Sequence, residues 1–436
     1  MLTGRVGAVP SERARPASRG RRQAPGGGSP KAILRGTHRA ASLAQTLAKI
    51  TPLTAPLGIT RVANVTGLDC IGIPVVMVCR PNARSLAVSQ GKGLDLDAAR
   101  VSGLMESIEL YHAERVTQPL LLASYNELYQ SRRVVAVDAL PRVSISQFHR
   151  NLPILWLQGT DAVDGEPTLI PYELVHTNYT LPLPTGSGCF VLSSNGLASG
   201  NHLLEAVSHG LCEVIERDAT TIFRCQADQT QARARLDLSS ITDPDCRQLL
   251  NLYERADVAV GVWDVTSDIG IATFQCVVLD RDPNPFRRLG PLEGMGCHPV
   301  RAVALQRALT EAAQGRLTLI AGSRDDYGRE RHERTQDADL LEKARLWLAE
   351  RGTRSYDATP SYEHATFEQD IQTILAKLSD ASVPHPIIVD LSKPELDVAV
   401  ARVVVPGLET YHDVPGYLPG ERALRILKAR AAEVCS

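Results

Sequence analysis

The chain has 436 residues, of which 44% are hydrophobic and 22% charged, a composition typical of a globular protein with a large core. Its formal net charge of −2 and its aromatic content of 5% argue against a broad basic surface or a base-stacking platform for nucleic acid. The sequence contains no apolar run near the roughly 20 residues that a membrane-spanning helix needs. We therefore expect neither nucleic acid nor a membrane as a partner.

The N-terminal segment, residues 1–30, differs in composition from the rest. It is rich in Arg, Gly and Pro and poor in apolar residues, which predicts a disordered tail. An organellar transit peptide has a similar bias, but this segment lacks an amphipathic period and a secretory signal. The nine cysteines form no CxxC pair and show no zinc spacing. We expect a cytoplasmic protein whose cysteines are mostly buried thiols.

The first half of the ordered chain mixes short helices and strands. We expect a helix over 42–49 and strands over 59–67 and 71–79. Residues 90–93, Gln-Gly-Lys-Gly, predict a turn, and a long helix follows with Asp95 or Asp97 as its N-cap. Residues 116–165 indicate helix and loop. Strands over 168–174 and 188–193 then lead to a turn at 194–196 and a second long helix over about 201–226.

The second half continues with strands over 261–266 and 271–280, which predict a hairpin, and a third long helix over 299–319. The polar segment 323–339 predicts a surface loop or a mobile lid. Strands over 386–391 and 398–407 and a helix over 420–434 end the chain. Strands and helices alternate without strict βαβ order. We therefore expect an α/β fold, with helices packed on a mixed sheet and two related halves.

The three long helices carry polar stripes beside their apolar faces. Glu106 and Glu109 lie on the first, and Glu213 and Glu216 on the second, each pair at i,i+3 on one helix face. The third helix has Arg307, Glu311 and Gln314 at i, i+4 and i+7. Acids on a helix flank often only face solvent. Here, however, the stripes adjoin the core, and buried carboxylates repel one another unless a cation joins them.

Several glutamates with arginines nearby suit magnesium and a polyphosphate. Arg217 and Arg307 provide the positive charge, although the sequence has neither a P-loop nor a dinucleotide-binding motif. The residues alone thus predict a multi-carboxylate metal site, with phosphoryl transfer as the candidate chemistry. His112, His209 and His298 also lie near the motifs and are alternative acid–base groups.

Three stretches match a known family. SGLMESIE, SNGLASGNHLLEAVSHGLCEVIER and RALTEAAQGR resemble the motifs of the YcaO family, whose members use ATP to activate peptide backbone amides. The resemblance extends from about residue 31 to about 419 and implies a YcaO catalytic domain over 31–436. One departure is that Leu110 follows Glu109, where the family's first motif often has ExxER.

The resemblance also implies a role for each matched residue. It implies magnesium ligands at Glu106, Glu109, Glu213, Glu216 and Glu311, nucleotide contacts at Lys31, Thr37, Asn201 and Glu205, and catalytic phosphate-facing cations at Arg217 and Arg307. The cofactors are then ATP and Mg²⁺, and catalysis is chiefly positioning and charge neutralisation.

The product depends on the group that replaces the amide oxygen. External sulfide gives a thioamide, whereas a neighbouring Cys, Ser or Thr side chain gives an azoline. The chain ends in AEVCS without the proline-rich tail of many azoline-forming members, and stretches such as VTGLDCIGIPV, YHAER and VVVPGLE resemble the branch that works with a TfuA-like partner. We therefore expect thioamide formation in a precursor peptide or protein. An azoline-forming cyclodehydratase is the alternative, and a non-catalytic peptide-binding scaffold is the second. The resemblance also implies a homodimer.

Overall fold

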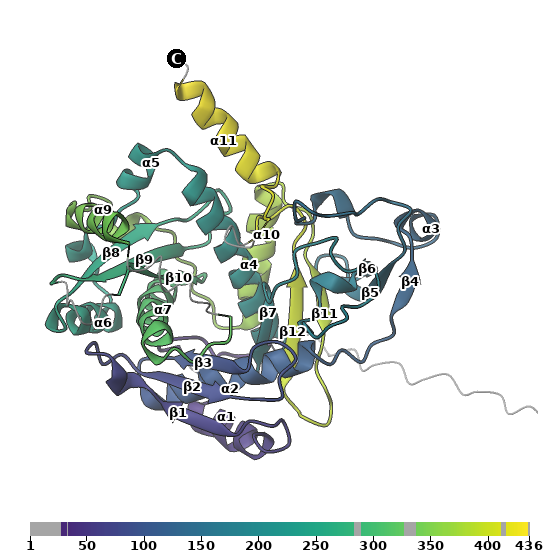
Figure 1. Ribbon diagram of the computed structural model, residues 1–436, viewed down its shortest axis with the longest axis horizontal. Helices are drawn as coiled ribbons and strands as arrows, with labels where there is room; N and C mark the ends of the chain where they lie inside the picture. Colours follow the sequence, from purple (N-terminus) through teal and green to yellow (C-terminus); the bar gives the residue numbers. More distant parts are fainter. Residues whose placement is uncertain (1–27, 33, 283–288, 327–336, 411–415, 435–436) are drawn as a thin grey trace, which may run out of the picture.

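The computed structural model describes residues 28–32, 34–282, 289–326, 337–410 and 416–434 (Figure 1). Most of the predicted disordered tail, up to residue 27, lies outside these ranges. The strands are β1 Arg61–Asn64, β2 Val75–Cys79, β3 Val88–Lys92, β4 Leu121–Ala123, β5 Ile154–Asp161, β6 Pro167–Pro171, β7 Leu197–Gly200, β8 Val258–Asp264, β9 Thr273–Asp280, β10 Leu292–Cys297, β11 Ile387–Asp390 and β12 Ala399–Val404. The helices are α1 Leu43–Ile50, α2 Leu96–Ala113, α3 Tyr125–Tyr129, α4 Leu203–Cys225, α5 Asp228–Arg233, α6 Pro244–Arg255, α7 Arg301–Ala321, α9 Ala338–Ala349, α10 Phe367–Asp380 and α11 Glu421–Val434.

The strands form three sheets, and every pairing between named strands is antiparallel. Two sheets have three strands, in the orders β1-β2-β3 and β10-β9-β8. The third runs β4-β5-β11-β12-β7, with β6 added on β5. In Figure 1 the first sheet lies at the bottom, the second at the left and the third at the right, and α4 runs between the last two. Helices packed on sheets confirm the expected α/β fold class, but the expected mixed sheet is instead three sheets in which the named strands all pair antiparallel.

The apolar stripes of the long helices form the core, as predicted. Val101, Leu104 and Ile108 of α2 are buried in the largest apolar cluster. The matching stripes of α4 and α7 enter two other clusters. Asp95 caps α2 by accepting the backbone N–H of Ala98 at 2.8 Å, so the first of the two predicted caps is the one used. Burying one face in this way leaves the polar stripes along the edge of the core.

Two of these helices lie unusually close to a strand because the strand has glycine at the contact. A Cβ added at Gly91 of β3 would meet the backbone nitrogen of Gly103 in α2 at 2.0 Å. A Cβ at Gly296 of β10 would meet the carbonyl oxygen of Ala304 in α7 at 2.1 Å. Only glycine permits such an approach of helix and strand backbones.

The same contact occurs in two parts of the chain, which confirms the expectation of two related halves. The shift in numbering that carries Gly91 to Gly296 also carries the first residue of α2, Leu96, to the first residue of α7, Arg301. It carries Glu106 to Glu311 as well. The unit of antiparallel sheet, edge strand and covering helix therefore occurs twice.

Three expectations about local structure are wrong. Residues 116–165, expected as helix and loop, include the strands β4 and β5. Residues 90–93 do not form a turn: the first three lie in β3, where glycine serves the close helix contact and not a bend. Residues 188–193 do not form a strand. The backbone N–H groups of Gly188, Cys189 and Phe190 instead donate to the carboxylate of Glu173, at 2.5–3.0 Å. Of the predicted loop 323–339, residues 327–336 lie outside the described ranges, and α9 begins at Ala338.

Candidate active site: a glutamate-lined cavity between three helices

Helices α2, α4 and α7 border one large cavity, and their polar stripes face it. The cavity has a volume of about 1670 Å³. A site for a single small ligand occupies roughly 300–1,000 Å³, so this cavity has room for a nucleotide and a second substrate. All five glutamates predicted to bind metal line it: Glu106, Glu109, Glu213, Glu216 and Glu311. The polar stripes of the three helices therefore border one cavity.

The edge strands of the three sheets orient four of these five carboxylates. In each sheet, the strand nearest the cavity (β3, β7 or β10) has a free edge. Backbone N–H groups along these edges donate to the glutamates: Gln90 to Glu106 at 3.3 Å, Ser199 to Glu109 at 3.0 Å, Met295 to Glu311 at 3.3 Å and Cys297 to Glu216 at 3.0 Å. Edge-strand donors that would otherwise attract another strand thus fix the carboxylates in place.

Two of these hydrogen bonds are equivalent in the two halves of the fold. Donor and acceptor are sixteen residues apart in both the Gln90–Glu106 and the Met295–Glu311 pair. Glu213 differs from the other four, because no backbone N–H is recorded as donating to it, and its recorded partner among the described residues is Arg217 at 3.9 Å. Glu213 is therefore held less firmly than its neighbours.

Burial in the cavity disfavours the ionised form of these carboxyl groups when no cation is bound. Burial raises the pKa of Glu109 to about 8 and that of Glu213 to about 7. Burial also raises the pKa of Glu106 and of Glu216. For Glu311 burial acts in the same direction, but Lys92 and then Arg217 lower its pKa below the ordinary value. Acids destabilised in this way are suited to bind a divalent cation.

The spacing of the carboxylates indicates the kind of metal site. Among the described residues, no three of these five glutamates bring carboxylate oxygens within 4.8 Å of one another. They therefore do not form a closed protein cage. Magnesium is usually held by a few carboxylates together with substrate phosphates and water, which such an open arrangement permits. The residues fit Mg²⁺ bound together with a polyphosphate.

Cationic side chains lie among the glutamates. The Arg217 guanidinium is 3.3 Å from Glu216, and Arg307 lines the same cavity, with a buried Nε that has no hydrogen-bond partner among the described residues. The sequence predicted both Arg217 and Arg307 at this site. Sequence reasoning missed Lys92, whose Nζ lies 2.5 Å from Glu311, because the surrounding Gln-Gly-Lys-Gly was read as a turn. It also missed Arg39, which lines the cavity 3.7 Å from Glu205.

The residues predicted to contact nucleotide are only partly brought together. Thr37 and Glu205 line the cavity. Asn201 lies behind it: its backbone N–H donates to Glu205 at 3.2 Å, and its side-chain oxygen accepts from Thr46. Lys31 lies outside the cavity lining and is fully buried in an ion pair with Asp370 at 2.6 Å. Asn201 thus orients Glu205, and contact of Lys31 with a nucleotide requires a change in that ion pair.

Of the three histidines near the motifs, two lie at the cavity and one in the core. His209 and His298 line the cavity, and burial lowers the pKa of each well below 6.5. His112 belongs to the core, where Nδ1 lies 2.7 Å from the carbonyl oxygen of Ile108. All three are therefore neutral near pH 7.

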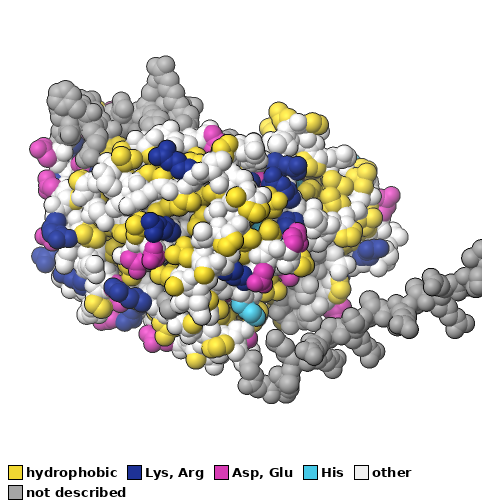
Figure 2. Space-filling model, turned by 90° about the horizontal axis from the view of Figure 1, so that it is seen from below, with side chains coloured by type: hydrophobic (Ala, Val, Ile, Leu, Met, Phe, Trp, Pro, Cys, Tyr) yellow, Lys and Arg dark blue, Asp and Glu magenta, His cyan; other side chains and the backbone are white. Residues whose placement is uncertain are grey.

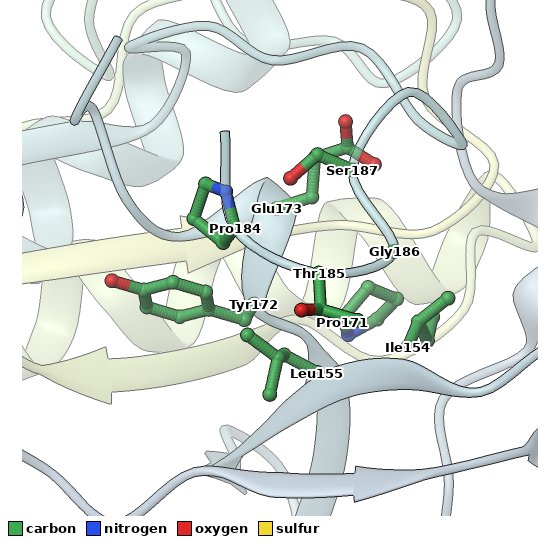
Figure 3. A pocket seen from close by; sticks show the side chains of 9 residues that line it. All are labelled: Ile154, Leu155, Pro171, Tyr172, Glu173, Pro184, Thr185, Gly186 and Ser187. Carbon is green, nitrogen blue, oxygen red and sulfur yellow. The ribbon is translucent and has the colours of Figure 1, made fainter. Parts of the chain in front are cut away.

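A second hollow, shown in Figure 3, lies under the loop at Pro184–Ser187. Tyr172 and Glu173 form part of its wall, beside Ile154 and Leu155 of β5. Its volume of about 10 Å³ holds at most one water molecule. This hollow is therefore a packing gap, and the glutamate-lined cavity is the candidate site.

The outer surface shows no sign of a single dominant charge on the face in Figure 2, where acidic and basic side chains are scattered among apolar ones. Within the described ranges, no helix combines the length and the apolar character that crossing a bilayer demands.

Comparison with known proteins agrees with this site. A profile described as YcaO cyclodehydratase, ATP- and Mg²⁺-binding, matches residues 90–409. A protein of Rhizobium leguminosarum bv. trifolii, named for its position in the tfuA 3′ region, is 36% identical over 397 residues, which are 89% of this chain and 93% of that protein. A protein of Methanothermobacter thermautotrophicus is 33% identical over 365 residues, 81% of this chain and 91% of its own length.

Two solved structures share the fold. YcaO from Methanopyrus kandleri, bound with AMPPCP and Mg²⁺, aligns with a TM-score of 0.70 at 24% identity and covers 90% of this chain and 98% of that one. A heterocyclase in complex with substrate and cofactor aligns with a TM-score of 0.72 at 22% identity, over 91% of this chain but only 55% of the heterocyclase chain. Given the profile match and the relatives above 30% identity, the chain belongs to the YcaO family, which is described as binding ATP and Mg²⁺.

Proposed function

We propose that this protein uses ATP and Mg²⁺ to activate a backbone amide of a peptide or protein for conversion to a thioamide. The observation that carries the proposal is the cavity in which five glutamates from three helices meet the cations Arg217, Arg307 and Lys92. Its size accommodates a nucleotide together with a peptide segment. The catalytic unit in this proposal is a single domain over residues 31–436.

The residues have separate tasks in this reaction. Magnesium is held by Glu106, Glu109, Glu213, Glu216 and Glu311. The nucleotide is bound with the help of Lys31, Thr37, Asn201 and Glu205. With Mg-ATP bound, the γ-phosphoryl group passes to the amide oxygen as ADP leaves, and hydrosulfide attack on the amide carbon then expels phosphate with that oxygen. Arg217 and Arg307 face the phosphates, where their fixed charges stabilise the negative charge of the transferring group.

The thioamide branch is favoured by the relative named for the tfuA 3′ region, which covers nearly the whole chain. We propose a TfuA-like protein as partner and a homodimer as the assembly, acting in the cytoplasm on a precursor peptide or protein. The buried cysteines Cys189, Cys212, Cys246, Cys276 and Cys297 are free thiols, as expected in a reducing compartment.

Mass spectrometry tests the reaction directly. The protein, a candidate peptide, Mg-ATP, sulfide and a TfuA-like partner are incubated, and the peptide mass is measured. Exchange of oxygen for sulfur adds about 16 Da, whereas azoline formation at Cys, Ser or Thr removes about 18 Da. A loss of water establishes the cyclodehydratase alternative, and an unchanged mass with every partner contradicts both reactions.

Nucleotide turnover tests the site itself. Glu213→Ala should abolish ATP hydrolysis while the protein stays folded, because the remaining glutamates are still held by the edge strands. Glu342→Ala is the matched control, since this glutamate is exposed on α9, and it should retain full turnover. Wild-type protein that binds no Mg-ATP in a calorimeter would instead support the peptide-binding scaffold.

A further inference from the structure

The carboxamides of Gln90 and Gln314 meet at one wall of the cavity. Gln90 lies in β3 and is 2% exposed, and Gln314 lies on α7. The Nε2 of Gln314 donates to the Oε1 of Gln90 at 3.5 Å, and both residues line the cavity. The Thr318 hydroxyl also contacts the Oε1 of Gln90 and donates to the Gln314 carbonyl oxygen at 2.8 Å.

This pair leaves one donor and one acceptor without a partner. Within the part of the chain that the structure describes, neither Nε2 of Gln90 nor Oε1 of Gln314 has a hydrogen bond, although both atoms are buried. Two carboxamides joined by a single hydrogen bond always leave one such donor and one such acceptor, and exchanging oxygen and nitrogen in both side chains does not alter that result. A ligand that supplies the missing partners recovers the free energy that these two unmade hydrogen bonds cost.

The pair lies beside the metal-binding glutamates. The backbone N–H of Gln90 holds Glu106, and Gln314 follows Glu311 by one helical turn. The shift in residue numbering that relates Glu106 to Glu311 also relates Glu109 to Gln314. Gln314 thus has the place of a glutamate in the other half of the fold, but it presents an uncharged amide to the cavity.

The pair also lies away from the residues assigned to the nucleotide. Arg39 lies close enough to Glu205 and Arg307 for both to affect its pKa, which burial lowers. These three residues therefore share one end of the cavity. On α7, Arg307 precedes Gln314 by about 10 Å at a rise of about 1.5 Å per residue, with Glu311 between them. The carboxamide pair therefore lies beyond Glu311 as seen from Arg307, which leaves this part of the cavity for the second substrate.

We infer that Gln90 and Gln314 together bind a peptide unit of the substrate next to the amide that is activated. A peptide unit presents one N–H and one C=O, which complement the free acceptor and donor of the pair. A donor placed on the reacting oxygen itself would draw electron density from the atom that must attack phosphorus. The neighbouring unit, only about 3.5 Å further along an extended chain, is therefore the one bound. The terminal torsions of glutamine are soft, so the two buried atoms can turn toward the ligand. This inference rests on the proposed function.

The experiment compares two probes that differ in their N–H groups. Protein labelled with ¹⁵N in glutamine side chains and saturated with Mg-AMPPCP is titrated with N-acetyl-glycyl-glycine N-methylamide. The side-chain NH₂ signals of Gln90 and Gln314, assigned by their loss in Gln90→Glu and Gln314→Glu, should shift together. The fully N-methylated analogue, N-acetyl-sarcosyl-sarcosine N,N-dimethylamide, should leave them in place. Equal shifts with both probes, or none with either up to the solubility limit, would overturn the inference.

A variant pair provides the second readout. Gln314→Leu should raise the Kd of the glycine probe about tenfold. In this variant the Kd is measured from the shift of the remaining Gln90 side-chain signal. Gln306→Leu is the control on the same helix. Gln306 also lines the cavity, and its Oε1 has no hydrogen-bond partner among the described residues. It lies toward Arg307, however, and its Nε2 donates to Asp243. Its loss should leave the Kd of the probe unchanged, and equal weakening by both variants would contradict the assignment.

Calorimetry with Mg-AMPPCP on the same samples separates the two proposals. Protein that binds the nucleotide analogue but shows no N–H-dependent shift overturns the glutamine assignment alone. Protein that does not bind the analogue overturns the proposed function, and the glutamine assignment with it.

Discussion

The carboxylate of Glu109 accepts two hydrogen bonds from the single residue Ser199, one from its backbone N–H at 3.0 Å and one from its hydroxyl at 2.6 Å. Both bonds lower the pKa of a carboxyl group that burial raises to about 8. Ser199 therefore keeps an otherwise protonated acid closer to the ionised form that binds a cation.

Removing the Ser199 hydroxyl should weaken magnesium binding. We expect Ser199→Ala to raise the Mg²⁺ concentration needed for half-maximal ATP hydrolysis at pH 7 about tenfold, or ~1.4 kcal/mol. At pH 9, where Glu109 ionises without help, the difference from wild type should shrink. Ser107→Ala is the control, because the Ser107 hydroxyl is buried without a partner among the described residues. An equal effect at both pH values would rule out a role through the ionisation of Glu109.

Lys92 should attract both Glu311 and the phosphates. Its ammonium lies 2.5 Å from Glu311 and is a main reason why the pKa of that glutamate is low despite burial. We expect Lys92→Met to raise the KM for ATP about tenfold, since a charge-assisted interaction is worth roughly 1.5–3 kcal/mol. Lys343→Met, at an exposed position on α9, should leave KM unchanged. Steady-state kinetics at saturating Mg²⁺ measure the KM for ATP of both variants, and an unchanged KM in Lys92→Met would contradict this role.

The stability of the ligand-free protein should depend on Glu109. Its pKa is about 8 in the folded protein and about 4.3 in an unfolded chain, so between these values the unfolded state binds fewer protons. This group therefore makes the free energy of unfolding decrease as pH rises from about 4.5 to about 8, by up to ~1.4 kcal/mol per pH unit.

Bound Mg-AMPPCP should reverse that trend, because it stabilises the ionised carboxylate. The increase in melting temperature that it causes should grow from pH 6 to about pH 8 and then level off. Glu109→Gln removes this titrating group and should make both profiles less steep, although Glu213 still titrates. A wild-type profile identical to that of the variant would show that Glu109 ionises near its ordinary pKa.

The glycine contact between β10 and α7 should be essential for stability. A Cβ at Gly296 would lie 2.1 Å from the Ala304 carbonyl oxygen, so Gly296→Ala must push the helix outward, and we expect a loss of ~1–3 kcal/mol. Gly315→Ala is the matched control on α7. There the nearest atom is 3.5 Å from the new Cβ, and alanine favours the helix by up to ~1 kcal/mol. Urea unfolding of both variants provides the measurement, and equal free energies would contradict this account of the packing.

The helices and their functional faces could be predicted from the sequence, because they depend on a local period. The apolar residues of α2, α4 and α7 repeat every three to four positions, which fixes both the buried face and the polar stripe beside it. The family motifs lie on these same stripes. The five candidate metal ligands and the two arginines could therefore be chosen without the tertiary structure, and all seven line one cavity.

The remaining features depend on contacts that no local pattern encodes. Gly91 weakens a strand by propensity, and its reason for being there is a helix backbone that only the folded chain brings near. Lys31 and Asp370 are 339 positions apart in the sequence (370 − 31), the same separation as in the neighbouring Ser29–Glu368 contact. The hydrogen bonds from edge strands to the glutamates involve backbone atoms, which every residue but proline has, so side-chain identity gives no signal for them.

The glycine contacts also bear on protein engineering. A designer who grafts only the three glutamate-bearing helices onto another scaffold would transfer the acids without the strand N–H groups that aim them. The smallest portable version of this centre is the three helices together with β3, β7 and β10, with Gly91 and Gly296 left intact.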